Sequence, residues 1–278
     1  MEDKNPKPGS READIAESVS KIAWHLVARK YRYISVAVAA GAVALAFLDL
    51  RLSLAVVLVF FGIMSAKAGK FFMRYFAEAN GLKYEEYARV DSATGRLFKL
   101  GHGQDIANVI HGDFSGRPMR LFNFNYTTGS SKHVRRHPFT VLEVDFEKTV
   151  FPYILLQSRM MSKHAATDSW GNDKDRTIPL EEVFQKSFSL YVTQGYETEA
   201  LQIFTPGTLG FLVQNSADFS IEFAEDKMYI YDDKNISNRK ELQKLYDVAW
   251  KIFELLGPLL NRLHDDFSAL HPYYKDGK

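Results

Sequence analysis

Two long apolar segments, 34–48 and 52–66, dominate the hydropathy pattern of this chain. Neither contains a charged residue, and the short turn between them carries Asp49 and Arg51. A helix buried in a soluble core normally keeps a polar stripe at helical spacing, and neither segment has one. We therefore predict a transmembrane helical hairpin over 33–74.

The length of each segment is marginal for a membrane span. About 15 residues give a helix of about 22 Å at about 1.5 Å per residue, whereas the hydrocarbon region is about 30 Å thick. The flanks supply the missing turns, because aromatic and basic side chains anchor at the interface. These flanking residues are Tyr31, Tyr33, Lys67, Lys70, Phe71, Phe72 and Arg74.

The basic residues near the hairpin lie almost entirely outside its turn. Four precede the first segment, three follow the second, and the turn contains only Arg51. Cytoplasmic flanks are enriched in Lys and Arg, so we expect a multi-pass membrane protein with both termini in the cytoplasm. The flanking residues counted here are Lys21, Arg29, Lys30, Arg32, Lys67, Lys70 and Arg74.

The N-terminal region, 1–32, is predicted to be a polar tail followed by an amphipathic helix. Apolar residues recur at spacings of three and four after Ser10, which is a suitable N-cap. This helix could lie on the inner leaflet with Trp24 and Tyr31 at the level of the headgroups. It could equally pack its apolar stripe on the soluble domain.

The remaining chain, 75–278, is predicted to form one cytosolic α+β domain with a mainly antiparallel sheet. Strand patterns occur at 108–128, with a turn near 113–116, and at 139–146, with an intervening loop at 127–138. Further strands are expected at 153–156, 188–192, 219–223 and 228–231. Strands followed by helices without strict alternation favour α+β over α/β.

Two helices of this domain have clear start signals. Thr205 followed by Pro206 is typical of an N-cap and a first helical position. Asn238, with Glu241 three residues later, resembles a capping box for a C-terminal helix with an apolar face. We expect Pro258 to kink or end that helix. The second apolar helix of the hairpin should continue to a stop at Asn80 and Gly81.

Composition excludes several classes of function. The chain has no cysteine, so disulfides, thiolate metal sites and cysteine nucleophiles are ruled out. Its 35 Lys and Arg balance 34 Asp and Glu, which gives no general field to attract nucleic acid. Dinucleotide, phosphate-loop, serine-hydrolase and zinc-protease motifs are not matched, and we expect no cofactor and no metal.

His133 and His137 lie four residues apart, beside a basic run in the loop 127–138. On a helix this spacing would favour a metal site. The neighbouring cations repel a divalent ion, so a solvated loop, or a patch that binds an anion or a lipid headgroup, is a better interpretation than a metal site. The patch comprises Lys132, Arg135 and Arg136.

A second candidate site is a polar face of the sheet. Asn123 and Asn125 alternate with aromatic residues, and Glu143 and Asp145 alternate with aliphatic ones. If the four side chains converge, they could bind a hard cation or perform acid–base chemistry. The alternative is the ordinary solvent face of an antiparallel sheet.

Three stretches carry a family resemblance: ANGLKY at 79–84, GDFSGRPMRLFNFNY at 112–126 and FTVLEVDF at 139–146. With the two apolar segments, they resemble a group of uncharacterised bacterial membrane proteins that have two N-terminal transmembrane helices and a cytosolic domain of unknown function. The resemblance covers about half of the soluble part. It implies a bacterial inner membrane and transfers no catalytic residues.

These observations favour a non-enzymatic function. The first hypothesis is a membrane-anchored interaction or scaffold domain that contacts the lipid bilayer and a protein partner or a second copy of itself. The second is a membrane-tethered enzyme or small-ligand sensor that uses the polar sheet face and the long polar loop 162–177, whose length exceeds that of ordinary connections.

Overall fold

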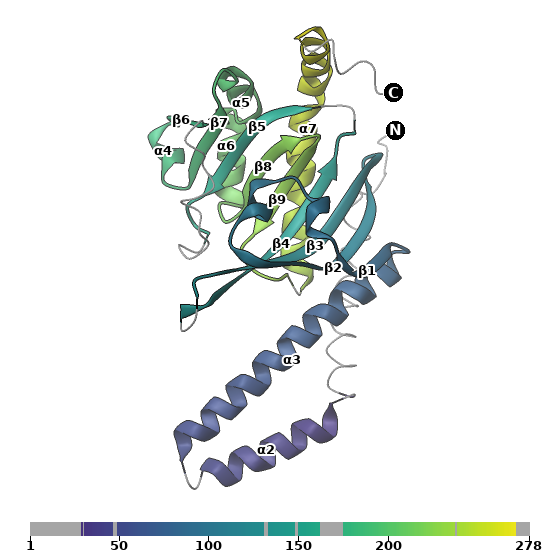
Figure 1. Ribbon diagram of the computed structural model, residues 1–278, viewed down its shortest axis with the longest axis vertical. Coiled ribbons are helices and arrows are strands. Elements are labelled where there is room, and N and C mark those ends of the chain that lie inside the picture. The colour runs from purple at the N-terminus through teal and green to yellow at the C-terminus, as the bar shows by residue number, and fades with distance from the viewer. Residues whose placement is uncertain are drawn as a thin grey trace, which may run out of the picture. The chain divides into compact units, whose positions relative to one another are not determined.

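A computed structural model describes residues 29, 31–46, 49–130, 133–147, 150–161, 175–236 and 238–270 (Figure 1). The chain divides into two compact units. One comprises Met1–Tyr84 and Ile236–Gln243, and the other comprises Glu85–Asn235 and Lys244–Lys278. The expected N-terminal amphipathic helix lies almost entirely outside the described residues.

The first unit contains a pair of helices, α2 (Arg32–Ala46) and α3 (Leu50–Ala79). Asp49 caps α3, because its carboxylate accepts hydrogen bonds from the amides of Arg51 at 2.8 Å and Leu52 at 3.3 Å. The Ser53 hydroxyl donates to the carbonyl of Ala42 at 2.7 Å, which joins the two helices close to their turn. Both predicted helices are therefore present, and they contact each other near the turn.

The predicted end of α3 is also confirmed. Asn80 is the C-cap, and its amide nitrogen bonds back to the carbonyls of the last helical turn. Gly81 follows with φ +65°, a conformation that glycine adopts without the Cβ penalty of other residues.

The two helices differ in length and so in whether they could cross a membrane. In the part of the chain that the structure describes, α3 is the one helix long and apolar enough to cross a bilayer, with a mean hydropathy of 2.0 over its most apolar window. Helix α2 is apolar but has only 15 residues. Length and composition thus support one span directly, and the second depends on the flanking residues of α2.

The second unit is built on a nine-stranded sheet in the order β1-β2-β3-β4-β9-β8-β5-β7-β6 (Figure 1). Across the sheet, every pair of neighbouring strands between β2 and the edge strand β6 is antiparallel, which confirms the predicted sheet type. The strands are β1 (Lys83–Ala88), β2 (His102–Phe114), β3 (Arg117–Thr128), β4 (Arg135–Asp145), β5 (Phe151–Ser158), β6 (Asp175–Ile178), β7 (Phe188–Thr193), β8 (Ser220–Glu225) and β9 (Lys227–Asp232).

The β8–β9 hairpin lies between β4 and β5, although both of those strands precede it in sequence. It contains nearly all of the predicted strands 219–223 and 228–231, and Asp226 alone separates the two strands. Tyr229 and Tyr231 point to the same face as Phe122, Phe124 and Phe139, because alternate residues of paired strands share a face.

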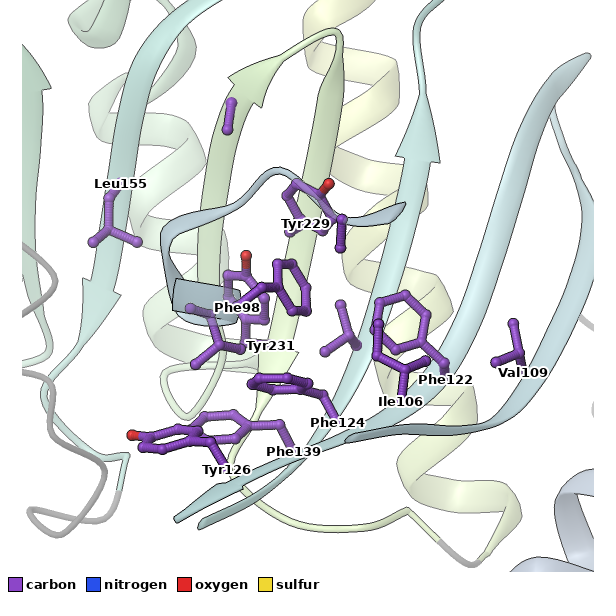
Figure 2. Packing of buried hydrophobic residues seen from close by; sticks show 14 of the residues in the cluster. Phe98, Ile106, Val109, Phe122, Phe124, Tyr126, Phe139, Leu155, Tyr229 and Tyr231 are labelled. Carbon is purple, nitrogen blue, oxygen red and sulfur yellow. The ribbon is translucent and has the colours of Figure 1, made fainter. Parts of the chain in front are cut away.

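Helix α7 (Arg239–Leu270) lies behind the sheet, on the face opposite to these rings (Figure 2). Its Phe253 contacts Phe114 and Phe146, with ring centroids 5.8 and 6.3 Å apart. The predicted cap is confirmed, since the Asn238 carboxamide oxygen accepts from the amide of Glu241 at 3.1 Å. Shorter helices are α4 (Glu182–Gln185), α5 (Glu197–Ile203) and α6 (Pro206–Asn215).

Three predicted boundaries differ in the structure. Helix α7 continues past Pro258, because a proline removes one backbone hydrogen bond and the turns around it can persist, and a kink at this position stays a prediction. The loop 127–138 is shorter than expected, since Thr128 and Arg135 still pair. The end of the loop 162–177 forms edge strand β6, where polar side chains are tolerated, and residues 162–174 lie outside the described part.

The cap of α6 provides a stability prediction. The Thr205 hydroxyl oxygen accepts from the amide of Thr208 at 3.2 Å, and Pro206 occupies the first turn as predicted. Thr205→Ala should lower the free energy of unfolding by about 1 kcal/mol, the usual cost of losing such a cap. Denaturant titration of the detergent-solubilised chain measures it. Thr198→Ala, at an exposed position inside α5, is the control and should cause no loss.

Candidate functional site

The predicted polar face does not form, because its four residues lie on opposite faces of the sheet. Asn123 pairs with Thr140, and Glu143 pairs with Arg120, so the strand register separates the asparagines from the two acidic residues. Asn123, Asn125 and Glu143 are buried rather than solvent-facing. The expected convergence was wrong because each strand's alternation leaves the register between strands undetermined.

Each of these polar residues has its own partner. The Asn125 carboxamide donates to Asp105 at 3.0 Å, and Asp145 lies 3.3 Å from the Lys227 ammonium. Asn123 accepts a long hydrogen bond, 3.4 Å, from the Thr140 hydroxyl. These contacts satisfy buried polar atoms and do not gather ligands around one point.

The basic patch is partly neutralised where the structure describes it. Arg135 and Arg136 begin β4 with exposed side chains, and Lys132 lies outside the described residues. The Arg136 guanidinium is 3.3 Å from the Asp105 carboxylate. Such an exposed pair is worth less than about 1 kcal/mol. An anion-binding role for this patch stays a prediction.

The two histidines beside the patch are not placed to bind the same metal ion. His137 is buried in β4, stacked on Tyr126 with ring centroids 4.7 Å apart, and its Nε2 lies 2.7 Å from the Thr128 hydroxyl. His133 is exposed in the loop before β4. Across the described ranges, no group of three or more His, Asp or Glu side chains could hold a metal ion.

The most distinctive feature of the sheet unit is a segment that covers a face of the sheet rich in buried aromatic rings. The hydrophobic pattern of the sequence did not predict it. Residues 89–100, here called the strap, contain two short 3₁₀ helices, η1 (Val90–Ser92) and η2 (Arg96–Lys99), and pass in front of the sheet (Figure 2). We define the aromatic face by the buried rings beneath the strap: Phe122, Phe124, Tyr126, Phe139, Tyr229 and Tyr231.

Phe98 of the strap fills the centre of this face. Its ring is 4.9 Å from Phe124, 5.3 Å from Tyr229, 5.9 Å from Phe122 and 6.2 Å from Tyr231, measured between centroids (Figure 2). Most of these contacts are edge-to-face or tilted, the geometry that aromatic quadrupoles favour. The strap therefore occupies the position that a ligand on this face would need.

Polar side chains of the sheet hold the strap at three points. The Glu222 carboxylate accepts from the amide of Arg96 at 2.8 Å. The Tyr229 hydroxyl accepts from the amide of Thr94 at 3.1 Å. The Arg120 guanidinium donates to the hydroxyl of Ser92 at 2.9 Å and to its carbonyl at 3.0 Å. We call these three contacts the clasps.

Glu222 is the unusual member of the clasps, since its side chain is fully buried in the central strand β8. Burial raises the pKa of its carboxyl, and the amide of Arg96 and the Tyr231 hydroxyl, which donates to it, partly oppose that rise. Burial also raises the pKa of Tyr231 well above its usual value, so the phenol stays neutral.

The backbone of Gly95 in the strap lies directly against the Glu222 carboxyl. A Cβ atom on Gly95 would stand 2.6 Å from the Tyr231 hydroxyl and 2.8 Å from the Glu222 carboxylate. The Arg96 guanidinium covers the neighbouring Tyr153 ring at 3.4 Å from its centroid. In this arrangement the carboxyl can hold or release a proton, but Gly95 leaves no room beside it for a substrate.

The third clasp rests on a buried ion pair. Arg120 makes two bonds of 2.7 Å to the two oxygens of Glu143, with side chains 18% and 4% exposed. This two-bond geometry is the strong form of the Arg–carboxylate interaction. Glu143, predicted as part of a polar site on the sheet, instead orients the guanidinium that binds the strap.

The sequence contains a signal for this site. Tyr229 and Tyr231 are two residues apart in a strand, and Glu222 stands between the apolar residues Ile221 and Phe223 in another. Charged residues are rarely buried without partners, so a glutamate between two core residues indicates a buried polar contact. The strap itself has no strand or helix period and gives no comparable signal.

Comparison with known proteins supports the fold alone. No protein-family model matches the sequence, and the comparison with curated proteins finds no match. Among solved structures, the crystal structure of the mycobacterial trehalose monomycolate transport factor A, TtfA, is similar with a TM-score of 0.51. The similarity covers 68% of this chain and 94% of that one, at 12% sequence identity. The chain therefore shares the fold of this transport factor at a distant level.

Proposed function

We propose that this protein is a membrane-anchored scaffold, in which a cytosolic α+β domain binds a protein partner or a second copy of itself. Helices α2 and α3 form the anchor, and the bilayer is a bacterial inner membrane. This proposal assigns the protein no reaction of its own.

The observation that carries the proposal is the exposed apolar surface of the hairpin. Large apolar side chains of α3 face outward along most of its apolar stretch, and Leu58 at its centre is 62% exposed. A contiguous exposed apolar surface of this kind is unfavourable in water and marks a membrane or protein contact. Its length, apolar character and basic flanks favour the membrane. The exposed side chains of α3 include Leu50, Leu52, Leu54, Val56, Val57, Leu58, Val59 and Ile63.

The charges at the helix ends support a cytoplasmic position for both termini. Arg32 begins α2, whereas Lys70 and Arg74 lie in the last third of α3. Between the helices, Arg51 is accompanied by the capping Asp49. Lys and Arg near membrane ends favour the cytoplasmic side, while Asp contributes little, so the turn between the helices is the part that crosses.

Two features support an interaction role over catalysis. Phe98 occupies the centre of the aromatic face, and the four residues of the expected polar site are divided between two faces. The enzyme or sensor alternative depended on that polar site and on the loop 162–177. The fold likeness to a transport factor is consistent with an accessory protein that assists a membrane process.

A pair of matched substitutions tests the anchor. Leu58→Arg places a charge at the centre of the proposed span, and we expect it to move the protein from the carbonate-washed membrane fraction to the soluble or aggregated fraction. Val183→Arg changes a residue of similar exposure, 59%, in α4 of the sheet unit and should leave the protein in the membrane. Equal fractionation of the two variants would refute the anchor.

Thiol labelling tests the orientation, because the chain has no cysteine of its own. A cysteine at Arg51 should react with an impermeant reagent from outside intact cells, and cysteines at Ser10 and Lys278 should not.

Chemical crosslinking in membranes followed by purification tests the scaffold role and should recover a stoichiometric partner or a homo-oligomer. A monomer without a partner would contradict the scaffold role.

A further inference from the structure

We propose that the strap is a releasable lid over the aromatic face, and that ionisation of the buried Glu222 carboxyl releases it. This inference concerns regulation and does not depend on the membrane anchor or on the identity of a partner. It rests on how the strap is attached, on what it covers and on the one acidic clasp.

The strap is attached differently from the rest of the sheet unit. Its own backbone bonds are short-range, for example from the amide of Phe98 to the carbonyl of Gly95 and from the amide of Leu100 to the carbonyl of Leu97. The clasps join it to the sheet through side chains of the sheet, not through a strand ladder. A segment held by a few side-chain bonds and one inserted ring can open without separating any strands.

What the strap covers also favours a separate opening. Phe98 and Leu97 are its principal buried residues, while Val90 is only partly buried. Opening therefore exposes Phe98, Leu97 and the rings beneath them but separates no pair of strands, whereas removing any central strand would expose both faces of the sheet. Local opening should require less free energy than global unfolding.

Glu222 makes this opening dependent on pH. The groups that face its carboxyl are Arg96 of the strap, Tyr231 and Tyr229 of β9, and Tyr153 of β5. Burial keeps both β9 phenols neutral, so Arg96 supplies the only positive charge among these four groups. A protonated carboxyl can still accept from the amide of Arg96, so the clasp survives in the neutral form.

The direction follows from linkage. In the closed state burial raises the pKa of Glu222, and in the open state water returns it toward its ordinary value. The closed state thus binds the proton more tightly. Closure is most favourable below the ordinary carboxyl pKa and weakens as pH rises toward the closed-state pKa. Higher pH should release the strap.

Thiol labelling of the full-length, detergent-solubilised chain tests this directly. Leu97→Cys places a thiol on the buried side of the strap, and Leu142→Cys places one in β4 on the opposite face of the sheet. Both native side chains are 0% exposed. Rates are divided by the rate of free cysteine in the same buffer, which removes the pH dependence of the thiol. We expect the strap cysteine to react at least about tenfold faster at neutral pH, because a local opening is sufficient. Equal rates would overturn the proposal.

Glu222→Gln identifies the responsible group, because glutamine keeps an oxygen to accept from the amide of Arg96 but cannot ionise. The corrected rate at Leu97→Cys should rise by up to about tenfold per pH unit in the parent chain and be flat in the Glu222→Gln background. A pH dependence that persists with glutamine would refute the assignment to Glu222.

Two further measurements keep the test independent of the cysteine at Leu97. Hydrogen exchange at the amide of Arg96 is measured without any cysteine substitution and divided by the intrinsic exchange rate at each pH. The corrected rate should show the same pH dependence in the parent chain and lose it in Glu222→Gln. Gly95→Ala should speed exchange there, since the new Cβ meets Tyr231 and Glu222, whereas Gly116→Ala, which meets open space, should not. Unchanged exchange in Gly95→Ala would count against strap release.

Discussion

Glu143→Ala should lower the free energy of unfolding by about 3–5 kcal/mol, the usual cost of removing one member of a buried ion pair. The loss arises because Arg120 keeps its charge in a largely buried position without the two short bonds that compensate it. Weaker support for Ser92 of the strap adds to the effect. Denaturant titration of the detergent-solubilised chain, followed by tyrosine and tryptophan fluorescence, measures the change.

Two controls separate burial from charge. Glu254→Ala removes the acidic partner of Lys251 at the surface of α7, a pair 3.0 Å apart, and should cost no more than about 0.5 kcal/mol. The double variant Arg120→Met with Glu143→Leu removes both charges and should recover most of the loss, because apolar residues can replace a buried pair at little cost. A loss below about 1 kcal/mol for Glu143→Ala would show that water reaches the pair.

Gly101→Ala should be comparably damaging for a reason confined to the backbone. Gly101 directly follows the strap with φ +60°, and a Cβ there would lie 2.3 Å from the carbonyl oxygen of Thr127. The left-handed backbone costs about 1–2 kcal/mol for a residue with a Cβ, and relieving the clash costs about 1–3 kcal/mol more. Denaturant titration should show the combined loss.

The chain offers a matched control for this substitution. Gly116, in the β2–β3 turn, also has a positive φ, +79°, but a Cβ there meets nothing within 4 Å. Gly116→Ala should therefore show the backbone cost alone, about 1–2 kcal/mol. If the two variants lose the same stability, Thr127 moves freely away from position 101, and the close approach has no energetic importance.

The sequence predicted the local elements well because local rules determine them. The alternation of Phe122, Phe124 and Tyr126 identified β3, and the Thr205–Pro206 pair identified the start of α6. The α3 stop at Asn80 follows from the same kind of short-range signal. In each case the residues that decide the outcome are within a few positions of one another.

The candidate site was predicted poorly because it depends on pairings between distant residues. Alternation assigned Asn123 and Glu143 to polar sides of their own strands, but only the register of β3 against β4 determines whether those sides coincide. Glu222 meets Arg96 of the strap across 126 positions of sequence. No local pattern carries that information, and a strap without a period gives no sign of where it will lie.

The position of the β8–β9 hairpin has a consequence for biosynthesis. Strands β4 and β5 leave the ribosome early, yet the partner that lies between them is made later, and the Thr140 hydroxyl finds its acceptor, the carbonyl of Lys234, 94 residues further along the chain. Until then both strands present unpaired edges, which are templates for aggregation. Long-range pairing of this kind also folds slowly. The nascent protein should therefore need protection during translation until residue 232 has emerged, and truncation before β8 should yield an insoluble chain.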